Sequence, residues 1–291
     1  MSFSTISAIL RGRWLLDTNW TQAHLPLVFK MLKGDQVDLG NQKDKSTNAS
    51  KKDTYAGTAY GVSFYTDLSK LPSESIAVVS ITGPLMKQGD MCSWGMVDYT
   101  ALINRLGANG NVAGIILDID SPGGQADGTA MTADSITNAK QRKPVISVIQ
   151  DGMAASAGYW IASAADELYV TQGTDMVGSV GVYTTIADWN AHYQDHFKLP
   201  VKEIYAPQST DKNKDYREAL AGNDELVKSD LKVLADQFIN TVKRNRGARI
   251  QSNDWTTGKM FYANEAKKNG LIDGVRSFDQ VIKRMNDLIK N

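Results

Sequence analysis

A serine surrounded by small residues is the first feature of the chain that could do chemistry. Ser156 lies within Gly152-Met-Ala-Ala-Ser156-Ala-Gly158, which follows the apolar run 144–149 and leads into helix formers that end near Ala165. The run is short, β-branched and uncharged, which is typical of a buried strand. We therefore expect Ser156 at a strand-to-helix turn, where unpaired N–H groups and the helix dipole favour a developing negative charge.

Two interpretations of this serine follow from its position. As a nucleophile, it would use the small residues on either side to let a substrate backbone approach closely. As a helix N-cap, a role that serine favours, it would need no substrate, and the small residues would only allow tight helix packing. The local pattern leaves both interpretations open.

A second turn that could take part in a reaction is Asp120-Ser-Pro-Gly-Gly124, directly after a strand pattern that ends at Ile119. Paired glycines permit backbone dihedral angles that are closed to other residues, and they expose N–H groups without a side chain in the way. Such a turn could bind an extended peptide or a developing oxyanion, and it could also be an ordinary tight turn. It is not a phosphate loop, because the Gly-Lys-Ser/Thr ending and the dinucleotide fingerprint are missing.

The elements around these two turns predict an α/β protein. Strand patterns alternate with helix patterns, which implies βαβ units, parallel strands and right-handed crossovers, with helices packed on the sheet. Ligands bind such sheets at the carboxyl ends of the strands, where both turns fall. The expected strands are 76–81, 112–119, 144–149 and 167–170, and the expected helices are 97–106, 127–140 and 155–165.

The remaining elements extend the same domain. After another small-residue turn at 178–183, we expect a polar loop at 207–217 that carries Lys212 and Lys214. An amphipathic helix over 223–246 could pack on its own sheet or serve an interface. The other expected elements are a helix at 187–197, a strand at 201–205, a strand and helix within 257–270, and a final helix at 278–289.

Composition divides the chain into three parts. Residues 1–35 mix apolar and basic residues and predict a helical N-terminal appendage, with short helices at 14–17 and 25–32. Residues 36–62 predict a polar, flexible linker, since a charged stretch within them is too poor in apolar side chains to offset its ordering entropy. Residues 63–291 predict the globular domain.

Charge balance and residue counts exclude several functions. Lys and Arg together number 32, as do Asp and Glu, so the net charge is zero and does not favour nucleic acid or an anionic membrane as partner. No apolar run reaches the roughly 18 residues of a spanning helix, and the N-terminus has no secretion signal, so we expect no membrane anchor and a cytoplasmic location. The single cysteine, Cys92, excludes an intrachain disulfide, and the histidines His24, His192 and His196 lack a further ligand for zinc.

Four motifs, taken in this order, resemble the family of signal peptide peptidase A and the phage head-maturation proteases of the protein C type. They are Asp120-Ser-Pro-Gly-Gly124, Ala155-Ser-Ala-Gly-Tyr159, Gly178-Ser-Val-Gly-Val182, and Gly258-Lys-Met-Phe261 through Gly270-Leu-Ile-Asp273. The resemblance covers about residues 76–273. It implies a crotonase-like, or ClpP-like, α/β fold, which agrees with the βαβ pattern.

The resemblance implies a serine–lysine dyad in which Ser156 is the nucleophile and a loop lysine is the general base. A lysine can act as a base only where desolvation or nearby positive charge lowers its pKa. In this chain the loop differs from the usual spacing of the family: Lys212 requires the smaller insertion, whereas Lys214 keeps the aspartate that follows. Lys212 is the preferred base, and Lys214 is the alternative.

The resemblance also implies that backbone groups of Gly123, Gly124 and Ala157 form the oxyanion hole and bind substrate, without a metal or a cofactor. The lack of a well-placed histidine favours a lysine base over a Ser-His-Asp triad. Relatives form rings whose subunits build the sites together, so we expect a homo-oligomer.

Together these features predict a serine endopeptidase that is acylated on Ser156 and cleaves extended protein segments. The length, the lack of an anchor and the extra N-terminal segment resemble phage or prophage proteases that cut scaffold or capsid protein in the bacterial cytoplasm, at the procapsid. The alternatives are a soluble signal-peptide-peptidase-like protease of the host and a catalytically inactive assembly scaffold of the same fold. An acyl-coenzyme A enzyme is disfavoured, because a nucleophilic serine has no role in simple enolate stabilisation.

Overall fold

A six-stranded sheet is the frame of the molecule, seen in a computed structural model that describes residues 14–16, 30, 58–89, 93–186, 188, 190, 191, 194, 195 and 198–290. Its strand order is β11-β8-β6-β4-β3-β2, and all neighbouring strands are parallel. The predicted α/β class is therefore confirmed. The strands are β2 (Ala59–Gly61), β3 (Ser75–Thr82), β4 (Val112–Asp120), β6 (Val145–Ile149), β8 (Glu167–Val170) and β11 (Gly274–Val275).

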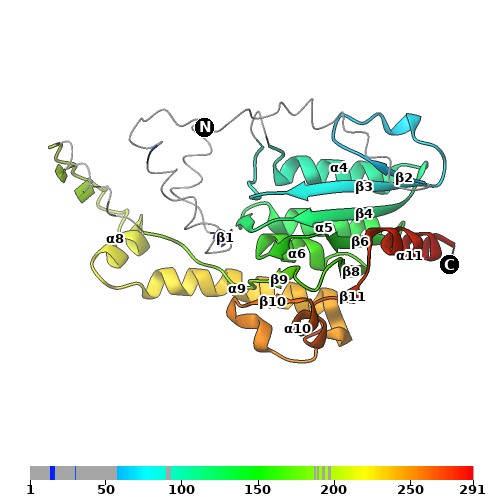
Figure 1. Ribbon diagram of the computed structural model, residues 1–291. Coiled ribbons are helices and arrows are strands. Elements are labelled where there is room, and N and C mark those ends of the chain that lie inside the picture. The colour runs from blue at the N-terminus through cyan, green and yellow to red at the C-terminus, as the bar shows by residue number, and fades with distance from the viewer. Residues whose placement is uncertain are drawn as a thin grey trace.

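Apolar residues on both faces of the strands bury this sheet between helical layers. On one face Ile116 and Val148 pack with Met285 of the C-terminal helix α11. On the other face a larger core continues into α4, α5 and α6, which connect successive strands (Figure 1). The bounds of these helices are α4 (Met96–Ala108), α5 (Thr129–Lys140), α6 (Ala157–Ser163) and α11 (Phe278–Lys290).

A small second sheet, of order β10-β9-β7, contains the short strand that joins β6 to α6. In it β7 is parallel to β9, with Ala155 opposite Gly178, and β9 is antiparallel to β10. The turn that starts at Gly178 therefore lies next to the residue that precedes Ser156. The elements of this part are β7 (Met153–Ala155), β9 (Met176–Gly178), β10 (Met260–Tyr262) and α10 (Ala263–Lys268).

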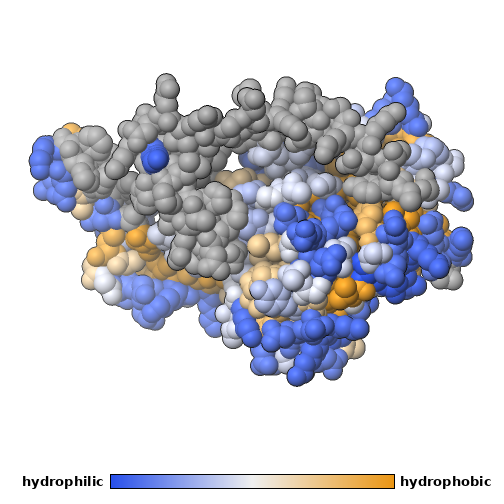
Figure 2. All heavy atoms as spheres, in the orientation of Figure 1, coloured by the Kyte–Doolittle hydropathy of each residue, from blue (hydrophilic) through white to orange (hydrophobic). Residues whose placement is uncertain are grey.

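Helix α9 (Glu225–Arg246) is an arm that packs on the domain only through its C-terminal part. There Phe238 is fully buried, and its ring stacks on Trp160 of α6 with the centroids 4.6 Å apart. The N-terminal part carries exposed apolar side chains, since Leu226 is 40% and Val233 is 66% exposed. Figure 1 shows this part projecting from the body together with α8 (Lys214–Leu220), and Figure 2 shows apolar surface along it.

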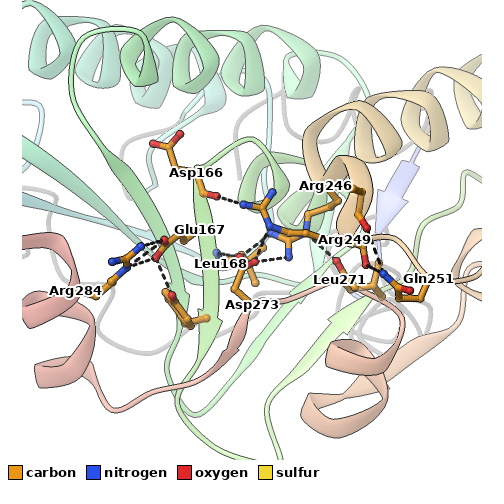
Figure 3. A network of polar contacts seen from close by, with 12 residues as sticks. Asp166, Glu167, Leu168, Arg246, Arg249, Gln251, Leu271, Asp273 and Arg284 are labelled. Atoms are coloured by element: carbon orange, nitrogen blue, oxygen red, sulfur yellow. Dashed lines mark hydrogen bonds and ion pairs between the residues drawn. The ribbon is translucent and has the colours of Figure 1, made fainter. Parts of the chain in front are cut away.

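A polar network ties the base of this arm to the segment that leads into β11 (Figure 3). Arg246, which is 1% exposed, donates to both oxygens of Asp273 at 2.9 and 3.1 Å and to the Gly270 carbonyl at 3.0 Å. Asp273 also accepts from the Leu168 N–H at 2.7 Å and pairs with Arg249 at 2.9 Å. The network therefore joins α9, β8 and β11. Short 3-10 helices span Leu68–Lys70, Gly247–Arg249 and Asp254–Thr257.

Two predictions of local structure are wrong. The helical appendage is contradicted at residues 14–16, which form strand β1 (Trp14–Leu16) because their backbone pairs antiparallel with β5 (Gly123–Gln125). Residues 201–205 are irregular and not a strand, since no described strand pairs with them and Ile204 is 83% exposed. An alternating pattern forms a strand only where a neighbouring edge can take up its backbone hydrogen bonds.

The main sheet starts earlier than the predicted domain start at residue 63. Strand β2 pairs with β3 from Ala59 onward, and the Ala59 side chain is fully buried, so residues 59–61 belong to the fold and not to the linker. Several predictions fall outside the described residues: the helix at 25–32 apart from Lys30, the linker up to residue 57, most of the helix at 187–197, Cys92, His24, His192 and His196.

Among the helices described here, none has the length and apolar character that crossing a membrane requires. Within the same ranges of the chain, no group of three or more His, Cys, Asp and Glu side chains is arranged to hold a metal ion.

Candidate active site

Ser156 lies in the turn between β7 and α6, where its sequence context predicts it. Its φ of 53° and ψ of −116° fall outside the regions that serine normally adopts, which costs roughly 1–3 kcal/mol. Hydrogen bonds hold this conformation on both sides. The Ser156 N–H donates to the Gly178 carbonyl at 2.8 Å, and the Ser156 carbonyl accepts from the Trp160 N–H at 2.9 Å. The second sheet and α6 thus fix the serine in a strained turn.

The Ser156 hydroxyl takes no part in capping α6. It makes no capping hydrogen bond, and its one hydrogen bond within the described residues is to the Gly181 carbonyl at 3.5 Å, which is too long to be strong. A capping serine has extended backbone dihedral angles, whereas Ser156 has a positive φ. Ser156 therefore occupies the N-cap position of α6, but its side chain does not cap the helix. The hydroxyl is left almost uncommitted, although the residue is only 1% exposed.

The side chain of Ser121 holds the turn at 120–124 in place. Its Oγ donates to the Gly83 carbonyl at 2.8 Å and accepts from the Gly123 N–H at 3.1 Å. The Gly123 carbonyl in turn accepts from the Leu85 N–H at 2.7 Å. The N–H and the carbonyl of Gly123 are therefore both hydrogen-bonded already, to Ser121 and to Leu85.

Gly124 differs from Gly123 because its backbone groups face the other edge of β5. The Gly123 carbonyl and the Gln125 N–H both bond to Leu85, the second at 2.8 Å. Successive residues of a strand direct their N–H and C=O groups to opposite edges, so those of Gly124 point away from Leu85. A Cβ on Gly124 would lie 1.8 Å from the Leu85 carbonyl oxygen, so only glycine lets β5 lie this close.

The two turns meet at the carboxyl ends of the strands. The Ala155 N–H, one residue before Ser156, donates to the Ser121 carbonyl at 2.9 Å, and α6 packs against β5. Ala157 follows Ser156 as the first residue of α6, and helix geometry leaves the first N–H groups of a helix without an intrahelical partner. The structure therefore brings Ser156, Ala157 and Gly124 into one region.

The two candidate lysines are not brought to this region within one chain. Lys214 is the first residue of α8, and Lys212 lies two residues earlier. Figure 1 shows α8 at the tip of the arm, well away from α6. Both lysines are exposed, and the Lys214 ammonium lies 3.5 Å from the Asp211 carboxylate. A lysine can act as a base only in an environment that excludes water, and both lysines are exposed to solvent in the single chain.

Asp175 supports the site, and nothing in the sequence pointed to it. Its side chain is 1% exposed, and its two oxygens accept from the N–H groups of Gly152, Thr171 and Gln172 at 2.8–2.9 Å. These bonds fasten the turn into β7 to the turn after β8, so they help to position the strand that leads to Ser156. An aspartate in a polar loop resembles any turn residue, so its pattern carries no sign of this role.

Asp118 is a half-buried carboxyl group on β4, two residues before the turn at 120–124. Its pKa is raised to about 6, chiefly by desolvation and also by the charge of Asp120, while a hydrogen bond from Gln150 at 2.9 Å opposes the rise. The folded protein therefore holds this proton more tightly than the unfolded chain, in which the pKa is near 3.8. Ionisation of Asp118 therefore lowers the free energy of unfolding.

The stability of the protein is expected to fall as the pH rises from about 4 to about 6, by at most about 3 kcal/mol from this group, and the cost persists above that range. Asp118→Asn keeps an oxygen acceptor for Gln150, so it should remove this part of the slope and raise the unfolding free energy by about 2 kcal/mol at about pH 7.5. Chemical denaturation across this range measures both. Asp134→Asn, at an exposed position of α5, is the control. Identical pH dependence in the two variants would contradict the assignment.

The fold and the site together define a class of protein. A parallel α/β sheet with a second, smaller sheet and a serine fixed beside a Gly-Gly turn has the ClpP-like fold, and the Clp protease family model matches residues 96–177, which contain both turns. The predicted crotonase-like or ClpP-like fold is confirmed. The model of peptidase family S49 matches residues 137–291, just over half of the chain. The chain belongs to peptidase family S49, which confirms the resemblance.

Curated relatives include proteases of bacteria and of phages. Capsid assembly protease C of Escherichia phage lambda is 29% identical over 219 residues, which are 74% of this chain and 49% of that protein. Protease 4 of Haemophilus influenzae is 25% identical over 284 residues, 89% of this chain and 45% of that protein. Head-tail preconnector protein GP5 of Enterobacteria phage P21 is 40% identical over 122 residues, 40% of this chain and 24% of that protein. The chain thus spans less than half the length of these relatives.

Proposed function

We propose that the chain is a serine endopeptidase that cleaves extended protein segments with Ser156 as its nucleophile. The observation that carries this proposal is the Ser156 hydroxyl, which sits in a strained turn and has only one long hydrogen bond, to the Gly181 carbonyl at 3.5 Å. A buried hydroxyl with a structural role normally makes a good hydrogen bond. Membership of a peptidase family supports the same assignment.

In the proposed reaction, the Ser156 Oγ adds to the carbonyl carbon of the substrate while a base accepts its proton. The N–H groups of Gly124 and Ala157 stabilise the oxyanion, since these residues belong to the two turns that meet beside the serine. Gly123 is the less suitable donor, because its N–H is bonded to the Ser121 hydroxyl. The base then protonates the leaving amine, and water hydrolyses the acyl-enzyme.

The base in this proposal comes from a second copy of the chain. Lys212, with Lys214 as the alternative, lies near the tip of the arm and away from Ser156 of its own chain (Figure 1). Exposed apolar side chains on the arm, such as Leu226 and Val233, offer a surface that a neighbouring copy could bury. Such an interface would exclude water around the lysine ammonium, which is the condition that a lysine base needs.

Mixing two inactive variants tests the shared site. Ser156→Ala and Lys212→Ala are each expected to cleave an unfolded, fluorescently labelled protein at least about 100-fold more slowly than wild type. Mixed under conditions that allow subunit exchange, they should regain activity, because some interfaces then hold an intact serine and an intact lysine. Lys228→Ala, on the same arm, is the control and should stay active. Full activity in both Lys212→Ala and Lys214→Ala would rule out the proposed base.

For the biological role, we propose a phage or prophage capsid-maturation protease that acts as a homo-oligomer in the bacterial cytoplasm, at the procapsid. Its support is the similarity, over 74% of this chain, to a phage protein named as a capsid assembly protease. A host peptidase is the second candidate, since the similarity to Protease 4 extends over 89% of the chain.

Assembly reactions with capsid and scaffold proteins from the same genome separate these roles. Wild type is expected to shorten one of these proteins on a denaturing gel, and Ser156→Ala is expected to leave the precursor uncut. Mature heads formed with Ser156→Ala would show that the chain is a scaffold without a catalytic role. Cleavage of signal peptides without cleavage of capsid precursors would favour the host peptidase.

A further inference from the structure

The N-terminal segment of the chain pairs with the strand that borders the candidate site. Strand β1 runs antiparallel to β5, with Trp14 opposite Gln125, Leu15 opposite Gly124 and Leu16 opposite Gly123. Leu85 forms backbone hydrogen bonds with the other edge of β5. Both edges of this short strand are therefore occupied, one of them by a segment more than 100 positions away in sequence.

The register of this pairing places the carbonyl of one β1 residue at the Gly124 N–H, the proposed oxyanion donor. The N–H and C=O groups of Gly124 point to the edge where β1 lies, because the Gly123 carbonyl and the Gln125 N–H are bonded to Leu85 on the other edge. In an antiparallel pair whose backbone groups face each other, directly opposite residues exchange both hydrogen bonds. The residue opposite Gly124 is Leu15, so the carbonyl that meets the Gly124 N–H is that of Leu15.

The direction of β1 follows from its antiparallel pairing with β5. Because β1 is antiparallel to β5, it runs from Gln125 toward Gly123 and so toward Ser121, whose carbonyl is bonded to the residue before Ser156. Trp14 and Leu15 lie along β5, and Leu16 lies opposite Gly123, at the end of β5 that is nearer to Ser121 in sequence. Adding a strand to an exposed sheet edge is a common mode of peptide recognition.

We propose that the first substrate of this protease is its own N-terminal segment, held on β5 and cut between Leu15 and Leu16; this inference rests on the proposed function. The Ser156 Oγ adds to the Leu15 carbonyl carbon, the C–N bond to Leu16 breaks, and the serine proton passes through the base to the Leu16 amine. Water then releases residues 1–15 with a Leu15 carboxylate and restores the hydroxyl. Until that cut, the segment blocks β5 against other peptides.

The burial of the serine agrees with an occupied site. Ser156 is 1% exposed in the full chain, so a protein substrate cannot reach it without a displacement of neighbouring groups. A segment tethered to the same chain competes at a high effective concentration, which lets a short strand hold an edge that a free tripeptide would not.

Intact-mass spectrometry of the full-length chain over time tests the inference. Wild type should separate into two pieces at the Leu15–Leu16 bond, and Ser156→Ala should stay whole. Leu15→Pro removes the N–H that pairs with Gly124, so it should also stay whole. With the segment released from β5, Leu15→Pro should react with a fluorophosphonate probe about tenfold faster than uncut wild type, if the site of the wild type is free about a tenth of the time. Thr47→Pro, in the polar stretch 41–53, is the matched proline control and should behave as wild type.

The outcomes separate this inference from the proposed function. If wild type and Leu15→Pro both cleave an added protein, react with the probe at the same rate and keep residues 1–15, the inference is wrong and the peptidase assignment stands. A cut elsewhere that Leu15→Pro does not affect also overturns it. If neither protein reacts with the probe nor cleaves any substrate, the proposed function fails and the inference fails with it.

Discussion

Gly124→Ala is expected to slow peptide cleavage at least about 100-fold, the loss that follows when one oxyanion donor is removed. The new Cβ would lie 1.8 Å from the Leu85 carbonyl oxygen and 2.5 Å from its carbonyl carbon. Both are backbone atoms, so no side chain can rotate away, and β5 must separate from Leu85. That movement displaces the Gly124 N–H from the position beside Ser156. We also expect a loss of about 1–3 kcal/mol in the free energy of unfolding from the overpacking.

Cleavage kinetics together with chemical denaturation measure both effects of this change. The matched control is Gly173→Ala, at an exposed glycine where a Cβ would meet nothing within 4 Å. The control should keep the activity and stability of wild type within experimental error. If Gly124→Ala is folded and as active as Gly173→Ala, the Gly124 N–H has no part in the reaction.

Asp273→Asn is expected to lower the free energy of unfolding by about 3–5 kcal/mol, which is the cost of leaving a buried charge without its partner. Arg246 is 1% exposed and donates to both Asp273 oxygens (Figure 3). The Asp273 carboxylate offers two acceptor oxygens to its donors, among them the N–H of Leu168 at 2.7 Å. The neutral amide of Asn offers these donors only one. Because these contacts join α9 to the sheet, the loss also loosens the attachment of the arm.

Thermal and chemical unfolding measure this loss, and we expect the midpoint temperature to drop by roughly 10 °C. Asp236→Asn breaks the exposed ion pair between Asp236 and Lys232 on α9 and is the matched control. Exposed pairs on helices contribute about 0.5 kcal/mol or less, so this control should unfold close to wild type. Equal stability of the two variants would show that the buried network does not hold the arm.

The long elements of the fold were predictable because apolar periodicity needs length to be visible. The main strands and helices between residues 75 and 170, and the helices over 225–246 and 278–290, agree with the prediction within a few residues. Strands β1, β5, β7 and β9 have three residues each, which is too short for a period, and only pairing with distant segments defines them. In the second sheet only β10 was expected, as the strand within 257–270, so most of that sheet could not be predicted from its own residues.

The candidate site was predictable where residue type alone restricts the backbone. Ser156 and the Gly-Gly turn stood out because small residues at the end of a strand let another backbone approach closely. The distinction between Gly123 and Gly124 could not be foreseen, since it depends on hydrogen bonds from Ser121 and Leu85. The place of the loop lysines near α8, at the tip of the arm, was also hidden, because residue spacing does not fix where a polar loop lies relative to the sheet.

The nucleophilic role of Ser156 is tested most directly by intact-mass spectrometry of the protein after reaction with a fluorophosphonate probe. Wild type should carry a single adduct, located on Ser156 by peptide mapping, and Ser156→Ala should carry none. Ser163→Ala removes a buried hydroxyl from α6, the helix that follows Ser156, and should be labelled like wild type. Folded, assembled wild type that stays unlabelled from about pH 7 to about pH 9, where a lysine base is expected to work, would contradict the assignment of Ser156 as the nucleophile.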